Sequence, residues 1–550
     1  MAKDDTVQIS KFSLTASLFS ANPLESNMKY QLMAISFFIA CIQLLLRLGC
    51  LGEYGFHQDE LLYLALSDHL AWGYREVPPF IAVIGRISKV LFGESVAAAR
   101  IIPSLCAFLI VYLTGLLTIR LGGRFFAVAI ACCAVAFSPA FLAAGALFIP
   151  QVFDELCWLT TAYLFVVYFQ TRNVHVLYCL GILAGIGVLI KYTYLLYVLG
   201  LFVGIGFDTT QRNLFTKKPF YIALFISIAI LTPHIWWQFQ NHFPALHHYS
   251  ELQKTQLTYL SRSEFFIQQL MVNATGLLVW LTAIFMLTKK RYAPYRFLGI
   301  AALLVMAVMV ILNGKSYYTF GCFPALFALG AIGIEHYFQK FSSTAKAALL
   351  ALITIPGLLS AIIVLPYLPI EKASQVFNWT YRNLGIDYPL KWEDQKIHHV
   401  NQNYADMIGW VELAQKTSKI FKSLPEETRS NTVVIAEKYG EAGAIDHYQK
   451  DYALPPIISL CSSYALWAPE QLTADHVIYI SNSPPPSFTN ARNVAVIANP
   501  FSRVVGLKIY LIKNVSPNTR EWYHLLWKAE RKPIKQPFLA FLKKAKGHKE

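Results

Sequence analysis

The sequence predicts a polytopic α-helical membrane protein that ends in a smaller soluble α/β domain. Of its 550 residues, 55% are hydrophobic and only 14% are charged, and the mean hydropathy is +0.44. Soluble domains contain about 45–50% apolar and about 25% charged residues. This composition excludes an ordinary soluble cytoplasmic enzyme, and it excludes disorder over most of the length, because disorder requires low hydrophobicity and high charge.

The membrane domain is expected over residues 30–367, because a span needs about 20 apolar residues and such runs recur along this part of the chain. We expect about eleven spans: 30–50, 95–119, 125–146, 154–170, 174–190, 192–207, 219–239, 265–287, 297–312, 318–337 and 346–367. The two beside Lys191 are short. The polar residues 1–29 carry no signal-peptide pattern, so the first span is expected to be an uncleaved anchor preceded by a cytoplasmic segment.

The orientation follows from the basic residues in the loops, which gather on the cytoplasmic side of membrane proteins. With the N-terminus inside, the inner loops carry Arg120, Arg124, Arg172, Arg212, Lys217, Lys218, Lys289, Lys290, Arg291, Arg296, Lys340 and Lys346. The opposite loops are poorer in cations, and everything after about residue 368 is placed outside. These loops and the C-terminal tail account for the net charge of +15, so we expect contacts with membrane lipids and none with nucleic acid.

The outer region after the last span is expected to form an α/β domain over residues 368–519. An amphipathic helix fits 403–422, and strands fit 432–436, 477–480, 494–497 and 507–511. Gly440 and Gly443 follow the first strand and fit a strand-to-helix turn better than a phosphate-binding loop. The tail, 520–550, has a net charge of +6 and interleaved aromatic residues, so it is either an interfacial helix on anionic lipid or a solvated basic tail.

Three negative observations narrow the chemistry. The nine cysteines show no zinc-ligand spacing, and eight lie in or beside apolar runs, so we interpret them as buried hydrophobic residues. The sequence has no Asp-x-Asp motif and no Gly-x-Ser-x-Gly motif. The first is the usual mark of a nucleotide-sugar site, and the second marks a nucleophilic serine.

The outer loop 52–94 carries the sequence His57-Gln58-Asp59-Glu60 just beyond the first span. A carboxylate pair is costly beside lipid, so it should line a polar cavity. Neighbouring carboxylates also disfavour each other's ionisation, which can bring one of them toward the pKa that a general base needs. The alternative is the N-terminus of a short helix, where acidic residues are favoured.

Several segments taken in order resemble a known family. They are Asp59-Glu60 with Tyr63, Trp72-Gly73-Tyr74 with Pro78-Pro79, Arg100, Asp154-Glu155, Lys191-Tyr192-Thr193, Lys315-Ser316-Tyr317-Tyr318, Asn403 to Trp410 and Tyr439 to Ala444. The chain resembles the bacterial relatives of dolichyl-phosphate-mannose–protein mannosyltransferases, GT-C glycosyltransferases that include the lipid A aminoarabinose transferases. The resemblance covers most of the chain and implies a GT-C fold in the bacterial inner membrane, with the C-terminal domain on the periplasmic side.

The resemblance implies inverting transfer of a sugar from a polyprenyl-phosphate donor to a hydroxyl of a lipid, glycan or protein acceptor. Asp59 is then the candidate base, and Glu60 orients the acceptor or the loop. Lys191, Lys315 and Arg75 are candidates for binding the donor phosphate, although each has an ordinary alternative as a snorkelling or solvated cation. The substrate cavity is expected to include His57, Tyr63, Glu76, Asp154, Glu155 and Tyr317.

The chain departs from the aminoarabinose transferases at two places where they carry cations. Leu62 stands in place of an arginine, and Val77 in place of a lysine. Glu76 is retained, and with His242, His247 or His248 it could hold a divalent metal; the alternative is that these histidines are solvated.

Two other classes stay open from the residues alone. One is a transporter or flippase of a lipid-linked substrate, and the other is a non-catalytic membrane scaffold. Transporters tend to carry repeats and ionisable groups near the bilayer midplane, whereas the ionisable residues here gather at the outer face. The identities of the sugar, the acceptor and the linkage are not encoded in any motif of this sequence.

Overall fold

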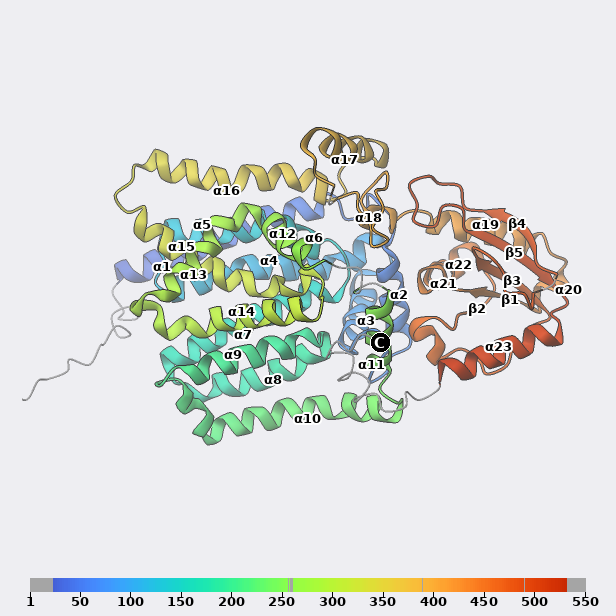
Figure 1. Ribbon diagram of the computed structural model, residues 1–550, viewed down its shortest axis with the longest axis horizontal. Helices are drawn as coiled ribbons and strands as arrows, with labels where there is room; N and C mark the ends of the chain where they lie inside the picture. Colours follow the sequence, from blue (N-terminus) through green and yellow to red (C-terminus); the bar gives the residue numbers. More distant parts are fainter. Residues whose placement is uncertain (1–22, 256, 258–260, 388, 489, 532–550) are drawn as a thin grey trace, which may run out of the picture.

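The structure is a computed structural model that describes residues 23–531 except 256, 258–260, 388 and 489. A bundle of long helices forms one end of the molecule, and a small sheet with its covering helices forms the other (Figure 1). Two short helices of the first outer loop, α2 and α3, lie between these two parts. The N-terminal residues 1–22 and the C-terminal residues 532–550 lie outside the described residues.

The bundle contains every segment that the sequence predicts as a span, but they differ in length. Seven helical segments of the described chain are long and apolar enough to cross a membrane, namely Asn27–Leu48, Val96–Arg120, Pro150–Thr171, Lys218–Gln240, Lys290–Ile311, Ser316–Tyr337 and Ser343–Val364. An eighth is a pair, Arg262–Val272 and Ala274–Thr288, bent by 72°. The described residues therefore contain seven or eight full-length candidate spans, against eleven predicted. The remaining three predicted spans are helical but shorter, namely Phe125–Ala136, Val174–Ile190 and Thr193–Phe207.

The helices and 3-10 segments of this part have the following bounds: α1 (Pro23–Leu48), α2 (Gln58–Asp68), α3 (Phe80–Phe92), α4 (Val96–Arg120), α5 (Phe125–Ala136), α6 (Pro139–Ala144), α7 (Pro150–Thr171), α8 (Val174–Ile190), α9 (Thr193–Phe207), η1 (Arg212–Thr216), α10 (Lys218–Gln240), α11 (Pro244–Thr255), α12 (Arg262–Val272), η3 (Ala274–Gly276), α13 (Leu277–Thr288), η4 (Lys290–Tyr295), α14 (Arg296–Ile311), η5 (Ser316–Cys322), α15 (Phe323–Tyr337) and α16 (Ser343–Val364). Glycines let neighbouring helices approach closely, as in many membrane bundles. A Cβ at Gly181 of α8 would lie 2.3 Å from the carbonyl oxygen of Ala223 in α10.

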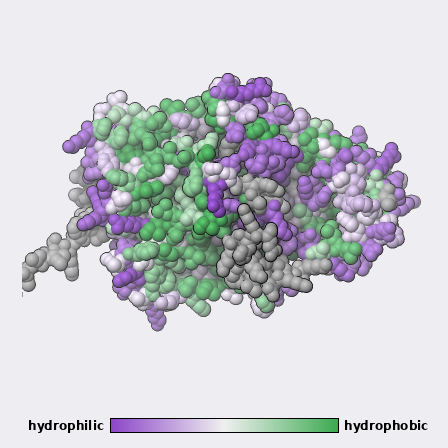
Figure 2. All heavy atoms as spheres, in the orientation of Figure 1, coloured by the Kyte–Doolittle hydropathy of each residue, from purple (hydrophilic) through white to green (hydrophobic). Residues whose placement is uncertain are grey.

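Hydrophobic residues gather over the sides of the bundle, and hydrophilic residues cover its far end and the sheet domain (Figure 2). Large apolar side chains on these sides are exposed, among them Phe225 at 70% and Leu303 at 58%. A soluble protein does not leave so large an apolar belt in water. The belt is therefore the lipid-facing surface of a membrane domain, as the composition predicts.

The C-terminal domain is a five-stranded mixed sheet with helices around it, as the sequence predicts for an α/β domain. Its strands are β1 (Thr432–Ala436), β2 (Ile457–Ile458), β3 (His476–Ser481), β4 (Arg492–Val496) and β5 (Lys508–Lys513), in the order β2-β1-β3-β5-β4. β1 pairs parallel with β2 and β3, whereas β5 pairs antiparallel with β3 and β4. Its other elements are α17 (Ile370–Leu384), α18 (Gln402–Ala405), α19 (Trp410–Lys422), α20 (Glu426–Arg429), α21 (Tyr439–His447), α22 (Gln449–Tyr452), η6 (Ser462–Leu466) and α23 (Pro517–Glu530).

The first part of the basic tail packs on this sheet. In α23, Tyr523 is fully buried, and the ring of Trp522 lies 5.1 Å from that of Phe488 in an edge-on contact. One face of this part of the tail is therefore covered by the sheet, while its other face is exposed, with Leu525 at 58%. For the remainder, 532–550, which is outside the described residues, both interpretations stay predictions.

Candidate active site

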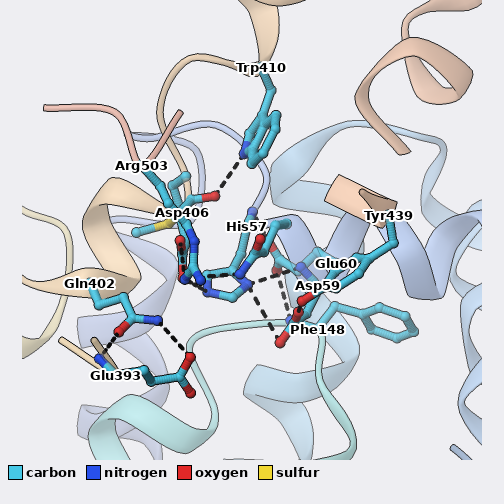
Figure 3. Close-up of polar contacts among 12 residues, drawn as sticks. His57, Asp59, Glu60, Phe148, Glu393, Gln402, Asp406, Trp410, Tyr439 and Arg503 are labelled. Atoms are coloured by element: carbon cyan, nitrogen blue, oxygen red, sulfur yellow. Dashed lines mark hydrogen bonds and ion pairs between the residues drawn. The ribbon is translucent and has the colours of Figure 1, made fainter. Parts of the chain in front are cut away.

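The first turn of α2 carries the His57-Gln58-Asp59-Glu60 sequence and is locked by a reciprocal cap (Figure 3). The Nδ1 of His57 accepts a hydrogen bond from the Asp59 N–H at 3.1 Å, and the Glu60 carboxylate accepts one from the His57 N–H at 2.8 Å. A ring nitrogen that accepts carries no proton, so the neutral ring is protonated on Nε2. The helix-N-terminus interpretation of this acidic pair is therefore correct, and it does not exclude a chemical role.

Glu60 is fully buried and bound on all sides. Arg100 donates through Nε to Oε1 at 3.0 Å and through Nη2 to Oε2 at 2.7 Å, and the Phe148 N–H donates to Oε1 at 2.8 Å. Burial alone would raise the pKa of Glu60, but Arg100 and the backbone donors outweigh it and lower that pKa. The expectation that the neighbouring carboxylates disfavour each other's ionisation is thus wrong for Glu60, because Arg100 neutralises its charge. Glu60 thus joins the first turn of α2 to α4 and to the backbone before α7.

Asp59 points the other way and keeps a free side. Its Oδ1 accepts a hydrogen bond from the hydroxyl of Tyr439 at 2.8 Å, its Oδ2 lies 4.0 Å from His57 Nδ1, and its side chain is 35% exposed (Figure 3). The two adjacent carboxylates therefore have different surroundings. Of the two, Asp59 is the one whose side chain is partly exposed.

The C-terminal domain reaches the same turn through Asp406. Its carboxylate accepts hydrogen bonds from Arg503 Nη1 at 3.1 and 3.2 Å, and its Oδ2 lies 3.4 Å from Nε2 of His57. Burial would raise the pKa of Asp406, but His57 and Arg503 lower it. Burial would likewise lower the pKa of His57, and the carboxylates around it, Asp406 first, raise it. These charges tie α2 to the segment before α19.

Tyr63 connects this turn to the later predicted residues. Burial, then the charges of Asp59 and Glu76 and the neighbouring phenols of Tyr317 and Tyr318, raise the pKa of Tyr63 well above its usual range. Residues from α2, from the first outer loop and from η5 therefore lie within electrostatic range of the Tyr63 phenol. The structure brings together what the sequence places about 250 residues apart.

Lys191 lies at the break between α8 and α9, where it ends α8 in an extended conformation. Its Nζ donates to Oε1 of Gln151 and lies 4.8 Å from the ring centre of Tyr318 and 5.3 Å from that of Tyr317. Gln151 in turn donates to the carbonyl of Tyr317 at 2.9 Å. The ammonium group thus lies over two aromatic rings beside a neutral amide, and among the described residues no carboxylate forms an ion pair with it.

Asp154 and Glu155 lie in the second turn of α7 and are both buried. Asp154 accepts hydrogen bonds from Trp158 Nε1 at 2.7 Å and from Thr193 Oγ1 at 2.9 Å. Glu155 accepts one from Gln151 at 3.0 Å. Both therefore support the loop that carries Lys191.

The other two candidate phosphate ligands are already paired. Lys315 donates to Glu393 at 2.6 Å, and its Nζ lies 5.9 Å from the ring centre of Tyr317, so it borders the site. Arg75 donates to the Glu530 carboxylate at 2.7 Å and to the carbonyl of Ser462 at 3.3 Å. Arg75 thus joins the outer loop to the C-terminal domain, and its phosphate-binding role stays a prediction without structural support.

The residues proposed for a metal do not fit one. In the part of the chain that the structure describes, no group of three His, Cys, Asp or Glu side chains could hold a metal ion. Glu76 accepts a hydrogen bond from Ser463 at 2.5 Å, and His247 lies 3.5 Å from Glu251 of the same helix.

Four residues that the sequence analysis gives no role complete the site: Arg100, Gln151, Asp406 and Tyr439. Three of them stand in segments that carry the family resemblance, and this was the available signal. No sequence signal marks Gln151, because it lies in an apolar helix, four residues before Glu155.

Comparison with known proteins agrees with the fold. The sequence model of a family described as dolichyl-phosphate-mannose-protein mannosyltransferase matches residues 76–237, which confirms the predicted resemblance over that segment. Among solved structures, ArnT from Cupriavidus metallidurans in the apo state superposes with a TM-score of 0.60 at 14% identity, covering 86% of this chain and 97% of that one. The same protein bound to undecaprenyl phosphate gives 0.58 at 12% identity, with 88% and 98% covered. No curated protein sequence matches significantly.

These matches extend over both parts of the molecule. The fold and the site define an integral membrane protein of the GT-C type with a C-terminal sheet domain, as predicted. Within that class, the matched segment resembles the mannosyltransferase family.

Proposed function

We propose that this protein is a glycosyltransferase that moves a sugar from a polyprenyl-phosphate donor to a hydroxyl of a lipid, glycan or protein acceptor, with inversion. The observation that carries the proposal is the placement of Asp59, a partly exposed carboxylate. Asp59 and the phenol of Tyr317 both lie within electrostatic range of Tyr63. The ammonium group of Lys191 lies 5.3 Å from the centre of the Tyr317 ring. A base near a cation is the minimum that this reaction requires. The GT-C fold, shared with a structure described as bound to undecaprenyl phosphate, supports the choice of donor.

In the proposed reaction, the acceptor oxygen forms a bond to the anomeric carbon while the bond from that carbon to the phosphate oxygen breaks. Asp59 takes the proton of the acceptor hydroxyl, and the electron pair of the broken bond leaves with the polyprenyl phosphate. Direct displacement inverts the anomeric configuration and needs no covalent sugar–enzyme intermediate. General-base assistance of this kind contributes about 10²–10⁴-fold to a rate.

The leaving phosphate gains negative charge in the transition state, and cations placed at that point stabilise it. Lys191 is the first candidate for this role, because its direct partner is the neutral amide of Gln151. Lys315 is the second, and a phosphate would compete with Glu393 for it.

The proposed location is the bacterial inner membrane, with the site and the C-terminal domain on the periplasmic side. The basic inner loops support this orientation. Polyprenyl-linked sugars presented on the outer face would then reach the site from the lipid phase.

The test is transfer of labelled sugar from a pool of polyprenyl-phosphate donors in membranes, comparing wild type with Asp59→Asn and Lys191→Met at equal expression. We expect both variants to lose at least about 100-fold in transfer rate. Asp68→Asn is the matched control, because Asp68 ends the same helix but pairs with Arg86 and Lys89 at the surface. Transfer unchanged in Asp59→Asn would reject Asp59 as the base. Absence of transfer with wild type would favour transport or a scaffold role.

A further inference from the structure

The C-terminal domain packs directly on the first turns of α2 through the start of α21. A Cβ at Gly440 would lie 3.0 Å from Cβ of Gln58, and a Cβ at Gly443 would lie 2.8 Å from Cβ of Leu61. The glycine pair does begin a helix after a strand, as predicted, but its consequence is close contact between α21 and α2. The position of α21 is set by the sheet, because only two residues separate the end of β1 from the start of α21.

Hydrogen bonds also join the C-terminal domain to the turn that carries Asp59. The carbonyl of Asp406 accepts from the N–H of Gln58 at 3.1 Å, and the hydroxyl of Tyr439 donates to Oδ1 of Asp59 at 2.8 Å (Figure 3). Burial, then the charge of Asp59, raises the pKa of the Tyr439 phenol well above its usual range, so it stays a donor at any physiological pH.

The bond from Tyr439 has a geometric consequence for Asp59. A surface carboxylate rotates readily about its terminal torsion. With Oδ1 held by the phenol, Oδ2 is the oxygen left to accept a proton, and the plane of the carboxylate is set. The other titratable groups that face Asp59 are His57, whose ring nitrogen is occupied by the cap, and Tyr63.

We infer that Tyr439 is a positioning residue for Asp59, so that the active site is complete only when the C-terminal domain is docked on α2. This inference rests on the proposed function and deepens it. The membrane domain supplies the base and the phosphate site, and the C-terminal domain supplies the group that orients the base.

The test compares Tyr439→Phe with Tyr464→Phe in the full chain, in the same labelled-sugar assay. Tyr464 is a matched control, because it is a buried tyrosine of the same domain and its hydroxyl donates to a carboxylate of α21, that of Asp446, at 3.0 Å. For Tyr439→Phe we expect kcat to fall roughly 10- to 100-fold, the loss that misplacing a reacting group causes, with KM for the donor unchanged. The acidic limb of the pH profile should move to higher pH, because the ionised carboxylate loses a donor.

The outcomes distinguish failure of the inference about Tyr439 from failure of the proposed function. Wild-type transfer with equal losses in both tyrosine variants, or with an unshifted pH profile in Tyr439→Phe, overturns the inference and leaves the proposed function standing. A loss of transfer in Tyr439→Phe accompanied by faster proteolysis between the two domains also counts against it, because docking rather than positioning would then be lost. No transfer by wild type with any polyprenyl-phosphate sugar overturns the proposed function and the inference together.

Discussion

Replacing Arg100 by methionine tests the structural role that we assign to the Glu60–Arg100 pair. Arg100 is 1% exposed and Glu60 is fully buried. The variant removes both side-chain donors to Glu60 and also leaves the carbonyls of Leu51 and Gly55 without the guanidinium bonds of 3.0 and 2.9 Å that they receive. Methionine has a comparable length, so the change is mainly one of charge and hydrogen bonding.

The expected loss is large because an unpaired buried charge remains. Breaking a buried ion pair by removing one partner costs about 3–5 kcal/mol. The N–H groups of His57 and Phe148 still donate to Glu60 in the variant. We therefore expect a loss of stability toward the lower end of that range. Protonation of Glu60 relieves the unpaired charge, so the loss should be smaller at pH 5 than at pH 8.

The measurement is the free energy of unfolding in detergent micelles by denaturant titration. The control is Arg86→Met, which removes a pair whose side chains are 55% and 46% exposed and should change stability by less than about 1 kcal/mol. The double variant Glu60→Gln with Arg100→Met should recover at least about 1 kcal/mol relative to Arg100→Met, because the buried charge is gone. The reasoning is refuted if Arg100→Met matches Arg86→Met, or if the double variant is less stable than Arg100→Met.

Two further predictions concern α21. Burial raises the pKa of Glu441 from 4.5 to about 7. The resulting contribution of Glu441 to the free energy of unfolding is at most roughly 3 kcal/mol. It is present below pH 4.5 and is lost as the pH rises to about 7. Glu441→Gln should therefore raise the melting temperature at pH 8 but not at pH 4.5, and an equal effect at both would contradict this cause. Gly443→Val should weaken docking on Leu61 by about 1–3 kcal/mol, seen as faster proteolysis between the domains. Gly52→Val, with no atom within 4 Å of its Cβ position, should cleave like wild type.

The membrane part could be predicted well from composition because burial in lipid requires continuous apolar runs. The number of full spans could not be predicted from composition, because an apolar run in the sequence does not show where a helix breaks. The segment around Lys191 shows the reason: two short helices meet there, and the break places an ammonium group beside Tyr318. The run 265–287 likewise bends by 72° near Asn273.

The site residues could be predicted only where their local pattern was unusual. The adjacent carboxylates of α2 and the isolated Lys191 stand out in an apolar sequence. Tyr439 does not, since no unusual local charge pattern marks it and it reaches Asp59 from 380 residues away. Arg503 is joined to the same turn through Asp406, which lies beside His57. Such contacts follow from the docking of two domains, which no local spacing encodes.

The adjacent carboxylates show how one short helix separates structure from chemistry. Successive residues of an α-helix point about 100° apart, so Asp59 and Glu60 cannot share surroundings. Glu60 faces inward to Arg100 of α4, while Asp59 faces Tyr439 of the C-terminal domain. The buried pair holds the helix against the bundle, and the partly exposed residue is held by a single phenol. A substitution at Glu60 should therefore act through folding, and one at Asp59 through the reaction, although the two stand side by side in the chain.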